Sequence, residues 1–114
     1  MALRDRKCVP CEGGTKPLSK AATKRLLAEL SGWTEQRKKL RKALKFADFR
    51  EAMAFLNRVA EIAEQEGHHP DFCVHYDRVD FTIWTHAIGG LSENDFILAA
   101  KIDGISRSRR SSRD

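Results

Sequence analysis

The chain has 114 residues, which is enough for one small domain with a single modest hydrophobic core. A hydrophobic fraction of 41% excludes an intrinsically disordered chain, and no apolar run approaches the ~20 residues of a membrane-spanning helix. The net charge of +5 comes largely from a basic segment over residues 37–45 and a Ser/Arg-rich end, which favour a solvated hairpin and a frayed terminus over a nucleic-acid site.

The first half of the chain predicts an extension, a helix and two short strands. Residues 1–16 show no periodicity and are expected to form a flexible extension, and without a hydrophobic signal core there the protein is expected to be cytoplasmic. Ser19 is a favourable N-cap for a helix that runs to Leu30. The segment from Trp33 to Phe46 predicts two strands joined by a basic turn over residues 37–39.

The second half predicts a long helix, a hairpin and a last helix. Asp48 and Glu51 form a capping box, and Gly67 suits the left-handed position that ends a helix. Alternating residues over 72–76 and 79–83 predict an antiparallel hairpin that turns around Asp77-Arg78. A final helix is expected to open at Ser92-x-x-Asp95, before a basic tail over residues 107–114.

This order of elements predicts an α+β fold over residues 17–106. Two hairpins joined by a helix make a four-stranded antiparallel sheet with helices on one face, a two-layer domain. An open sheet of this kind has two exposed edges, and pairing edges between subunits is a common way to cover them. A homodimer or homotetramer is therefore expected.

All four histidines lie between Glu64 and Asp95, and imidazoles with carboxylates suit proton transfer near neutral pH. Pro70 holds His69 extended, so His68 and His69 are expected to point in different directions. Taken singly, each residue has an ordinary explanation. The two histidines suit a helix C-terminus, Asp95 suits a capping box, and a histidine after a strand suits a solvated loop.

Metal and cysteine chemistry are alternatives at this stage. Two or three histidines with a carboxylate can hold iron or zinc, but the helical H-x-x-x-H arrangement is absent, so no metal is expected. Cys8 and Cys11 have zinc-knuckle spacing without a second pair, and an odd cysteine count argues against a disulfide framework. Cys73 lacks a nucleophile signature and is expected to pack as a small apolar residue.

The pattern Glu64-x3-His68-His69-Pro70-x5-Tyr76-x9-His86-x8-Asp95 resembles the pterin-4a-carbinolamine dehydratase family, and the resemblance runs from about Trp33 to Ile105. It implies that the active-site histidines are His68, His69 and His86. It further implies that Pro70 shapes the site, that Asp95 supports it, and that Glu64, Trp33 and Thr85 lie near the pterin. Trp84 stands where a serine is expected in animal members.

The resemblance implies loss of water from 4a-hydroxytetrahydrobiopterin, a product of aromatic amino-acid hydroxylases, to give quinonoid dihydropterin. No cofactor is needed, because the step is a pair of proton transfers. His68 is expected to be the principal acid/base, His86 its partner, and His69 a residue that orients the pterin. The alternative is a non-enzymatic interaction module, such as a RuBisCO assembly factor or a transcriptional coactivator; the intact histidine set favours the enzyme.

Overall fold

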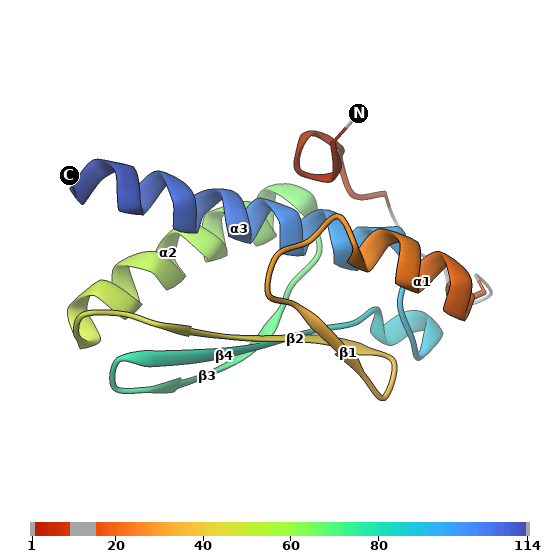
Figure 1. Ribbon diagram of the computed structural model, residues 1–114, viewed down its shortest axis with the longest axis horizontal. Coiled ribbons are helices and arrows are strands. Elements are labelled where there is room, and N and C mark those ends of the chain that lie inside the picture. The colour runs from red at the N-terminus through yellow and green to blue at the C-terminus, as the bar shows by residue number, and fades with distance from the viewer. Residues whose placement is uncertain (1, 10–15, 114) are drawn as a thin grey trace.

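The computed structural model describes residues 2–9 and 16–113, with side chains described as far as Ile105. Over these residues the chain forms a four-stranded antiparallel sheet with strand order β1-β2-β4-β3 and three α-helices. Figure 1 shows the helices gathered on one side of the sheet. The expected two-layer α+β fold is confirmed, with its elements in the expected order.

The N-terminal half contains α1 (Lys20–Leu27), β1 (Thr34–Gln36) and β2 (Lys39–Lys45). The Ser19 hydroxyl accepts a hydrogen bond from the Ala22 N–H at 3.1 Å, which confirms the expected cap. The helix ends three residues earlier than expected, where the Leu30 N–H bonds the Leu27 carbonyl in a tighter turn.

Helix α2 (Phe49–Glu66) ends directly before the histidine pair. Asp48 Oδ1 accepts the Glu51 N–H at 2.9 Å, so the chain enters the helix through the expected cap. Gly67 adopts a left-handed conformation with φ of 66°, which a side chain would disfavour. This turn ends the helix and sends His68 towards the sheet.

Strands β3 (Asp71–His75) and β4 (Arg78–Ile83) form the second hairpin. The turn contains Tyr76 and Asp77, one residue earlier than expected, and Tyr76 has a φ of 55°. The Phe46 N–H donates to the Asp77 carbonyl at 2.7 Å, which ties this turn to the end of β2. A contact from a residue distant in the sequence thus fixes a turn that local residue preference places elsewhere.

A short helical turn, η2 (His86–Ile88), connects β4 to α3 (Glu93–Arg113). The Ser92 N–H donates to Asp95 Oδ2 at 2.8 Å, as the expected capping motif requires. Thr85 and Gly90 pair across the connection. These contacts hold the chain where it leaves the sheet and place His86 beside the start of α3.

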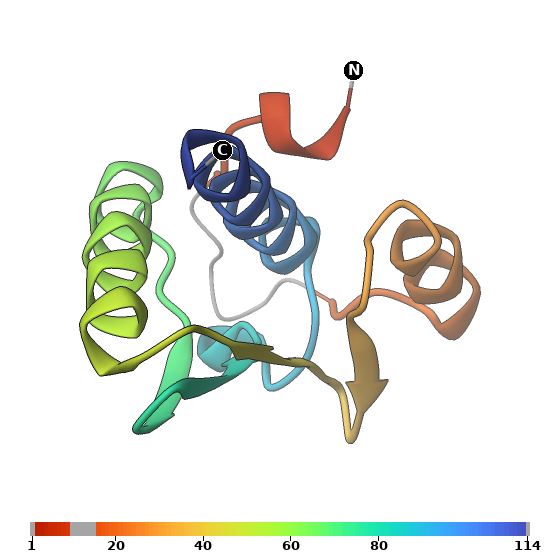
Figure 2. The same ribbon diagram turned by 60° about the vertical axis from the view of Figure 1, so that its left-hand side comes forward.

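The hydrophobic core lies between the sheet and helices α2 and α3. Figure 2, viewed towards the ends of these helices, shows them side by side above a strongly twisted sheet. The sheet contributes alternate residues of β2 and β4, and the helices contribute one face each. Fully buried members of this core include Leu40, Val79, Phe81, Ile83, Phe55, Val59, Phe96 and Ile102.

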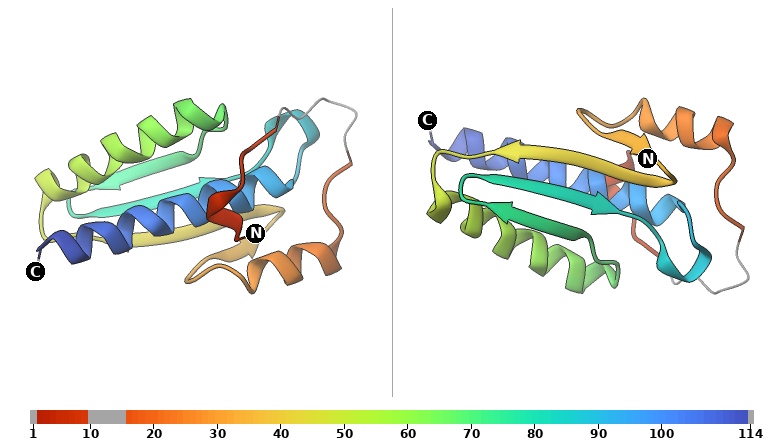
Figure 3. Two further views of the ribbon diagram at one scale, coloured as in Figure 1. Left: turned by 90° about the horizontal axis from the view of Figure 1, so that it is seen from above. Right: turned by 90° about the horizontal axis from the view of Figure 1, so that it is seen from below.

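Part of the N-terminal segment packs on the domain. Residues 2–9, within the range expected to be flexible, include a short 3-10 helix η1 (Leu3–Asp5) that packs on α3, as the left view of Figure 3 shows. The Leu3 side chain is 4% exposed and belongs to the core. A single apolar anchor produces no periodicity, so the sequence pattern gave no sign of it.

The opposite face of the sheet carries no helix in the described part of the chain, as the right view of Figure 3 shows. Side chains of alternating positions on β2, β4 and β3 point to this face. They are mostly polar and include Arg41, Lys45, Asp80, Thr82 and His75. Among the described helices, none combines the length and apolar character that crossing a membrane would require.

Candidate active site

A pocket of about 450 Å³ lies where the α2–β3 connection, the end of β4, η2 and the first turn of α3 meet the N-terminal segment. This volume falls within the range of small-molecule sites in proteins. The described residues that line it are Cys8, Val9, Glu66, Gly67, His68, His69, Asp71, Trp84, Thr85, His86, Ala87 and Asn94. The three histidines singled out in the sequence therefore share one pocket.

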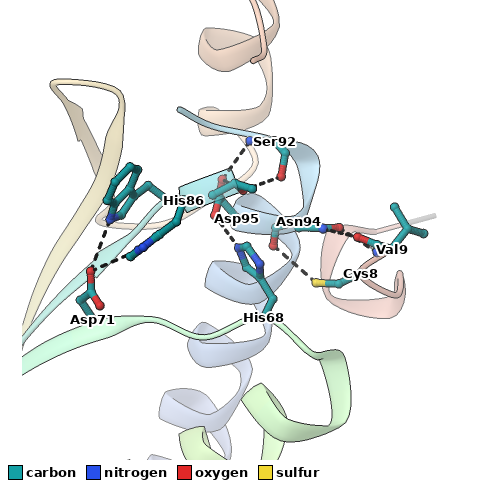
Figure 4. Close-up of polar contacts among 10 residues, drawn as sticks. Cys8, Val9, His68, Asp71, His86, Ser92, Asn94 and Asp95 are labelled. Atoms are coloured by element: carbon teal, nitrogen blue, oxygen red, sulfur yellow. Dashed lines mark hydrogen bonds and ion pairs between the residues drawn. The ribbon is translucent and has the colours of Figure 1, made fainter. Parts of the chain in front are cut away.

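His68 is the most buried of the three histidines and is held by a carboxylate. Its Nε2 lies 2.6 Å from Asp95 Oδ1, as Figure 4 shows. The His68 side chain is 12% exposed and that of Asp95 is fully buried. A short contact with a buried partner fixes the orientation of the imidazole before any ligand binds.

Asp95 is itself held by two further donors. Its Oδ2 accepts hydrogen bonds from the Thr85 hydroxyl and from the Ser92 N–H, each at 2.8 Å. The Thr85 hydroxyl proton goes to the carboxylate. The Ser92 hydroxyl, 2.8 Å from Thr85 Oγ1, therefore donates to that oxygen. Asp95 thus caps α3 and orients His68 at once, so its two expected roles are compatible.

The protonation pattern of His68 follows from this partner. An ionised carboxylate is only an acceptor, so the His68 Nε2 that faces it carries a proton. The Nδ1 atom is then the ring nitrogen that takes up or releases the second proton. This is the arrangement by which a buried aspartate prepares an imidazole for general acid–base chemistry.

His86 also lines the pocket, in a looser setting. Its ring stacks on Trp84 with centroids 4.0 Å apart, and its Nε2 is 3.7 Å from Asp71 Oδ2. The Trp84 Nε1–H donates to the same Asp71 oxygen at 3.3 Å. Figure 4 shows Asp71 reaching towards His86 from the start of β3. Both His86 and Asp71 are more than half exposed, so this pair is open to solvent.

His69 pairs with Glu64, one helical turn back on α2. The His69 Nε2 lies 2.6 Å from Glu64 Oε2, and both side chains are exposed. His68 and His69 therefore have separate carboxylate partners, as the extended backbone before Pro70 predicts. Glu64 and Pro70 are not among the described residues that line the pocket, so Glu64 reaches it only through His69.

Trp33 lies away from the pocket, although the resemblance implies a place near the pterin. Its side chain is buried beside Phe81, and its Nε1–H donates to Asp103 Oδ1 at 3.0 Å. Lys42 also contacts that aspartate, with Nζ 2.8 Å from Oδ1. Within this chain, Trp33 is a core residue.

The wall formed by the N-terminal segment was missed by sequence reasoning. Cys8 and Val9 line the pocket beside Asn94, the residue before Asp95. The Cys8 Sγ–H donates to the Asn94 carbonyl at 3.6 Å. Cys11, the other half of the zinc-knuckle spacing, lies outside the described residues. The local signal of this wall is weak, because Leu3 and Val9 merely flank a charged stretch over residues 4–7.

Burial affects two ionisable groups behind this wall. Burial, together with the nearby Glu66 carboxylate, raises the pKa of the Cys8 thiol to about 12. Burial alone would raise the pKa of Glu66, but the hydrogen bond from the Cys8 N–H and the Lys101 ammonium outweigh it and hold this pKa below its usual value. The thiol therefore stays protonated and is a poor nucleophile at neutral pH.

Other hollows lack this combination of groups. A second pocket of about 450 Å³ lies between α1 and the first hairpin, but its described lining contains no histidine. Among the described residues, no group of three His, Cys, Asp or Glu side chains is placed to hold a metal ion. The pocket with the three histidines is therefore the candidate active site.

Comparison with known proteins decides the family. The family model described as pterin 4 alpha carbinolamine dehydratase matches residues 16–105. The chain belongs to this family. The match spans all four strands, η2, α1, α2 and α3 as far as Ile105, and includes every histidine of the pocket.

Bacterial relatives support the assignment over nearly their whole length. A protein of Rubrobacter xylanophilus is 46% identical over 102 residues, which are 89% of this chain and 95% of the relative. One of Nitrosomonas eutropha is 51% identical over 104 residues, 89% and 90% of the two chains. Both are named, provisionally, as pterin-4-alpha-carbinolamine dehydratases.

Two solved structures share the fold. A transcriptional coactivator/pterin dehydratase from Brucella melitensis is 34% identical with a TM-score of 0.76, over 79% of this chain and 98% of that one. A pterin dehydratase-like protein, described as a RuBisCO assembly factor of the alpha-carboxysome, is 28% identical with a TM-score of 0.59, over 67% and 90% of the two chains. Members of this fold thus have different described roles.

Proposed function

We propose that the chain is a 4a-hydroxytetrahydropterin dehydratase, a lyase that releases water from pterin-4a-carbinolamine. The observation that carries this proposal is the convergence of His68, His69 and His86 on one pocket, with His68 clamped by the buried Asp95. Family membership supports the substrate class. The pocket volume of about 450 Å³ suits a bicyclic pterin.

The reaction needs two proton transfers and no electron acceptor. The C4a–O bond breaks and the hydroxyl leaves as water after taking a proton. N5 loses its proton, and the electrons of that N–H bond form the C4a=N5 bond of the quinonoid product. One protonated and one neutral imidazole supply both transfers, each with a typical effect of about 10²–10⁴-fold.

The geometry favours His68 as the principal acid/base. Its carboxylate partner is buried and close, so its ring needs no reorganisation when the substrate arrives. His86 lines the same pocket and is assigned the second proton transfer. His69, paired with Glu64 at the pocket rim, is assigned to binding and orientation of the pterin.

A direct assay tests the proposal. The purified protein is added to 4a-hydroxytetrahydrobiopterin generated freshly by an aromatic amino-acid hydroxylase, the class of enzyme that would supply this substrate. We expect faster formation of quinonoid dihydropterin, and we expect the rate to persist in excess chelator. Loss of activity in EDTA with recovery on adding zinc or iron would contradict the metal-free mechanism.

We also propose that the protein is a homodimer or homotetramer. Strands β1 and β3 are the outer strands of an open sheet, and their free edges favour pairing between subunits. Light scattering at micromolar concentration is expected to give a mass of two or four chains. A mass of one chain would contradict this proposal without affecting the assignment of the reaction.

A second candidate function is that of a non-enzymatic assembly module. It is favoured by the structural likeness to the protein described as a RuBisCO assembly factor. The dehydratase assay separates the two candidates. A folded protein with no activity, which also binds no reduced pterin, would favour the module.

A further inference from the structure

We propose that residues 6–9, called here the N-terminal strap, form a fixed wall of the pterin pocket and contribute to substrate binding. This inference rests on the proposed function, because it assigns a binding role in the same site. It adds a segment that the family match does not contain, since that match begins at residue 16. The strap acts on affinity, whereas His68 and His86 act on proton transfer.

The strap is anchored at its N-terminal side by packing and charge. Leu3, in the short helix η1 just before the strap, is buried in the core against α3. Arg6 then forms an ion pair with Glu93 in the first turn of α3. The Lys101 ammonium also donates to the Arg4 carbonyl at 2.9 Å. These contacts bring the chain to the edge of the pocket.

The strap backbone is then tied to both helices that frame the pocket. The Cys8 N–H donates to Glu66 Oε1 at 2.8 Å, at the end of α2. The Val9 N–H donates to Asn94 Oδ1 at 2.9 Å, and Asn94 Nδ2–H donates back to the Val9 carbonyl. Figure 4 shows this pairing beside the His68–Asp95 contact. Because the Asn94 amide binds both the N–H and the carbonyl of Val9, it fixes the position of the Val9 backbone.

Cys8 and Val9 are the strap residues that line the pocket. Val9 is 64% exposed even though its backbone is held, and an exposed apolar side chain with fixed backbone favours contact with a ligand. Cys8 contributes a thiol that stays protonated. Neither side chain transfers a proton at neutral pH, so the strap is expected to affect KM more than kcat.

The first experiment measures whether the strap is docked. In a Cys11→Ser/Cys73→Ser background, the rate at which iodoacetamide labels Cys8 is followed by mass spectrometry at pH 8. Asn94→Ala removes both side-chain bonds to Val9 and is expected to speed labelling at least about tenfold. The matched control is Asp48→Ala, which removes a single cap bond at the far end of α2, roughly 27 Å away along the helix. It is expected to leave the rate unchanged.

The second experiment measures binding. Val9→Trp keeps the backbone bonds to Asn94, so Cys8 labelling should stay slow, but the larger side chain occupies part of the pocket. We expect both Val9→Trp and Asn94→Ala to raise KM by about tenfold, the effect of one lost apolar contact, with kcat changed by less than about threefold. Binding of 7,8-dihydrobiopterin, followed by calorimetry, should weaken in parallel.

The outcomes separate the inference from the proposed function. In the first outcome the wild-type protein is active, Asn94→Ala labels fast, and KM is unchanged in both Val9→Trp and Asn94→Ala. This outcome would overturn the strap inference and leave the assigned reaction intact. Slow labelling in Asn94→Ala would show that the strap is not held by this pair and would also overturn it. A wild-type protein that neither binds dihydrobiopterin nor turns over substrate would remove the proposed function, and the inference with it.

Discussion

Two imidazole–carboxylate pairs hold histidines of the same pocket and differ in burial and distance. His68 and Asp95 are 2.6 Å apart, with side chains 12% and 0% exposed. His86 and Asp71 are 3.7 Å apart, and their side chains are 63% and 61% exposed. The first pair lies between two helices and the sheet, whereas the second lies at the open end of β4.

The difference shows how the fold distributes rigidity within one site. Asp95 is fixed by a helix start, a hydroxyl and a backbone N–H, so His68 is positioned before the substrate binds. His86 is held by stacking on Trp84 and by a solvent-exposed carboxylate, which water screens. Substitutions at the buried pair should therefore cost more activity than the same substitutions at the exposed pair.

The largest effect is expected for His68→Ala. If His68 is the principal acid/base, its removal should lower kcat by about 10²–10⁴-fold with little change in KM. Steady-state kinetics on freshly generated 4a-hydroxytetrahydrobiopterin measure this. His75→Ala is the matched control, because this histidine also has a carboxylate partner, Asp80, yet lies on the sheet face without helices.

Non-additivity sharpens the assignment of His68. If His68 and His86 act on one transition state, the double variant should lose less than the product of the two single losses. Circular dichroism must first show that each variant is folded. Near-normal turnover in folded His68→Ala would contradict the catalytic role of His68 and would favour the non-enzymatic interaction module.

Asp95→Asn is expected to have the next largest effect. The amide keeps the volume of the carboxylate but loses its charge and presents a donor that competes for the same partners, so His68 is no longer held in one protonation pattern. We expect kcat to fall by about 10–100-fold. A change in the pH profile of kcat would distinguish this positioning role from simple destabilisation, which thermal unfolding monitors separately. An unaltered profile with normal kcat would contradict the role.

The sequence predicted most of the fold because its signals are local. Ser19, Asp48 and Gly67 act within one helical turn, and alternation along β4 reflects contacts of one strand with one core. The turn at Tyr76 was placed one residue late, because a bond from Phe46, the residue after β2, fixes it. Such a tertiary contact has no local signature.

The candidate site was predicted in part for the same reason. The resemblance to a known family named the three histidines and Asp95 together, and the structure places the three histidines in one pocket. The contribution of Cys8 and Val9 depends on backbone bonds to residues 58 and 85 positions away, which no spacing rule reveals. Trp33 is the converse case, because a conspicuous aromatic residue proved to fill the core.

Asp71→Asn tests the exposed pair. Because Asp71 accepts from Trp84 and lies 3.7 Å from His86, its loss should loosen the His86 ring without removing it. We expect kcat to fall by about threefold to tenfold, less than in Asp95→Asn, since the pair is solvent-exposed. His86→Ala, measured in the same assay, gives the largest fall in kcat expected from a change in the His86–Asp71 pair. A loss in Asp71→Asn that equals or exceeds that of Asp95→Asn would contradict the comparison between the two pairs.

The smallest effect on turnover is expected for His69→Gln. His69 lies at the rim with Glu64, and glutamine retains a hydrogen-bond donor but cannot act as an acid or base near neutral pH. If His69 only orients the pterin, KM should rise by about threefold to tenfold while kcat changes by less than about twofold. Glu64→Gln, which removes the charge of the partner alone, should shift KM in the same direction by a smaller factor, because the pair is exposed and water screens it. A fall in kcat of a hundredfold in His69→Gln would show that the rim histidine takes part in proton transfer, and the division of roles between His68 and His69 would have to be reversed.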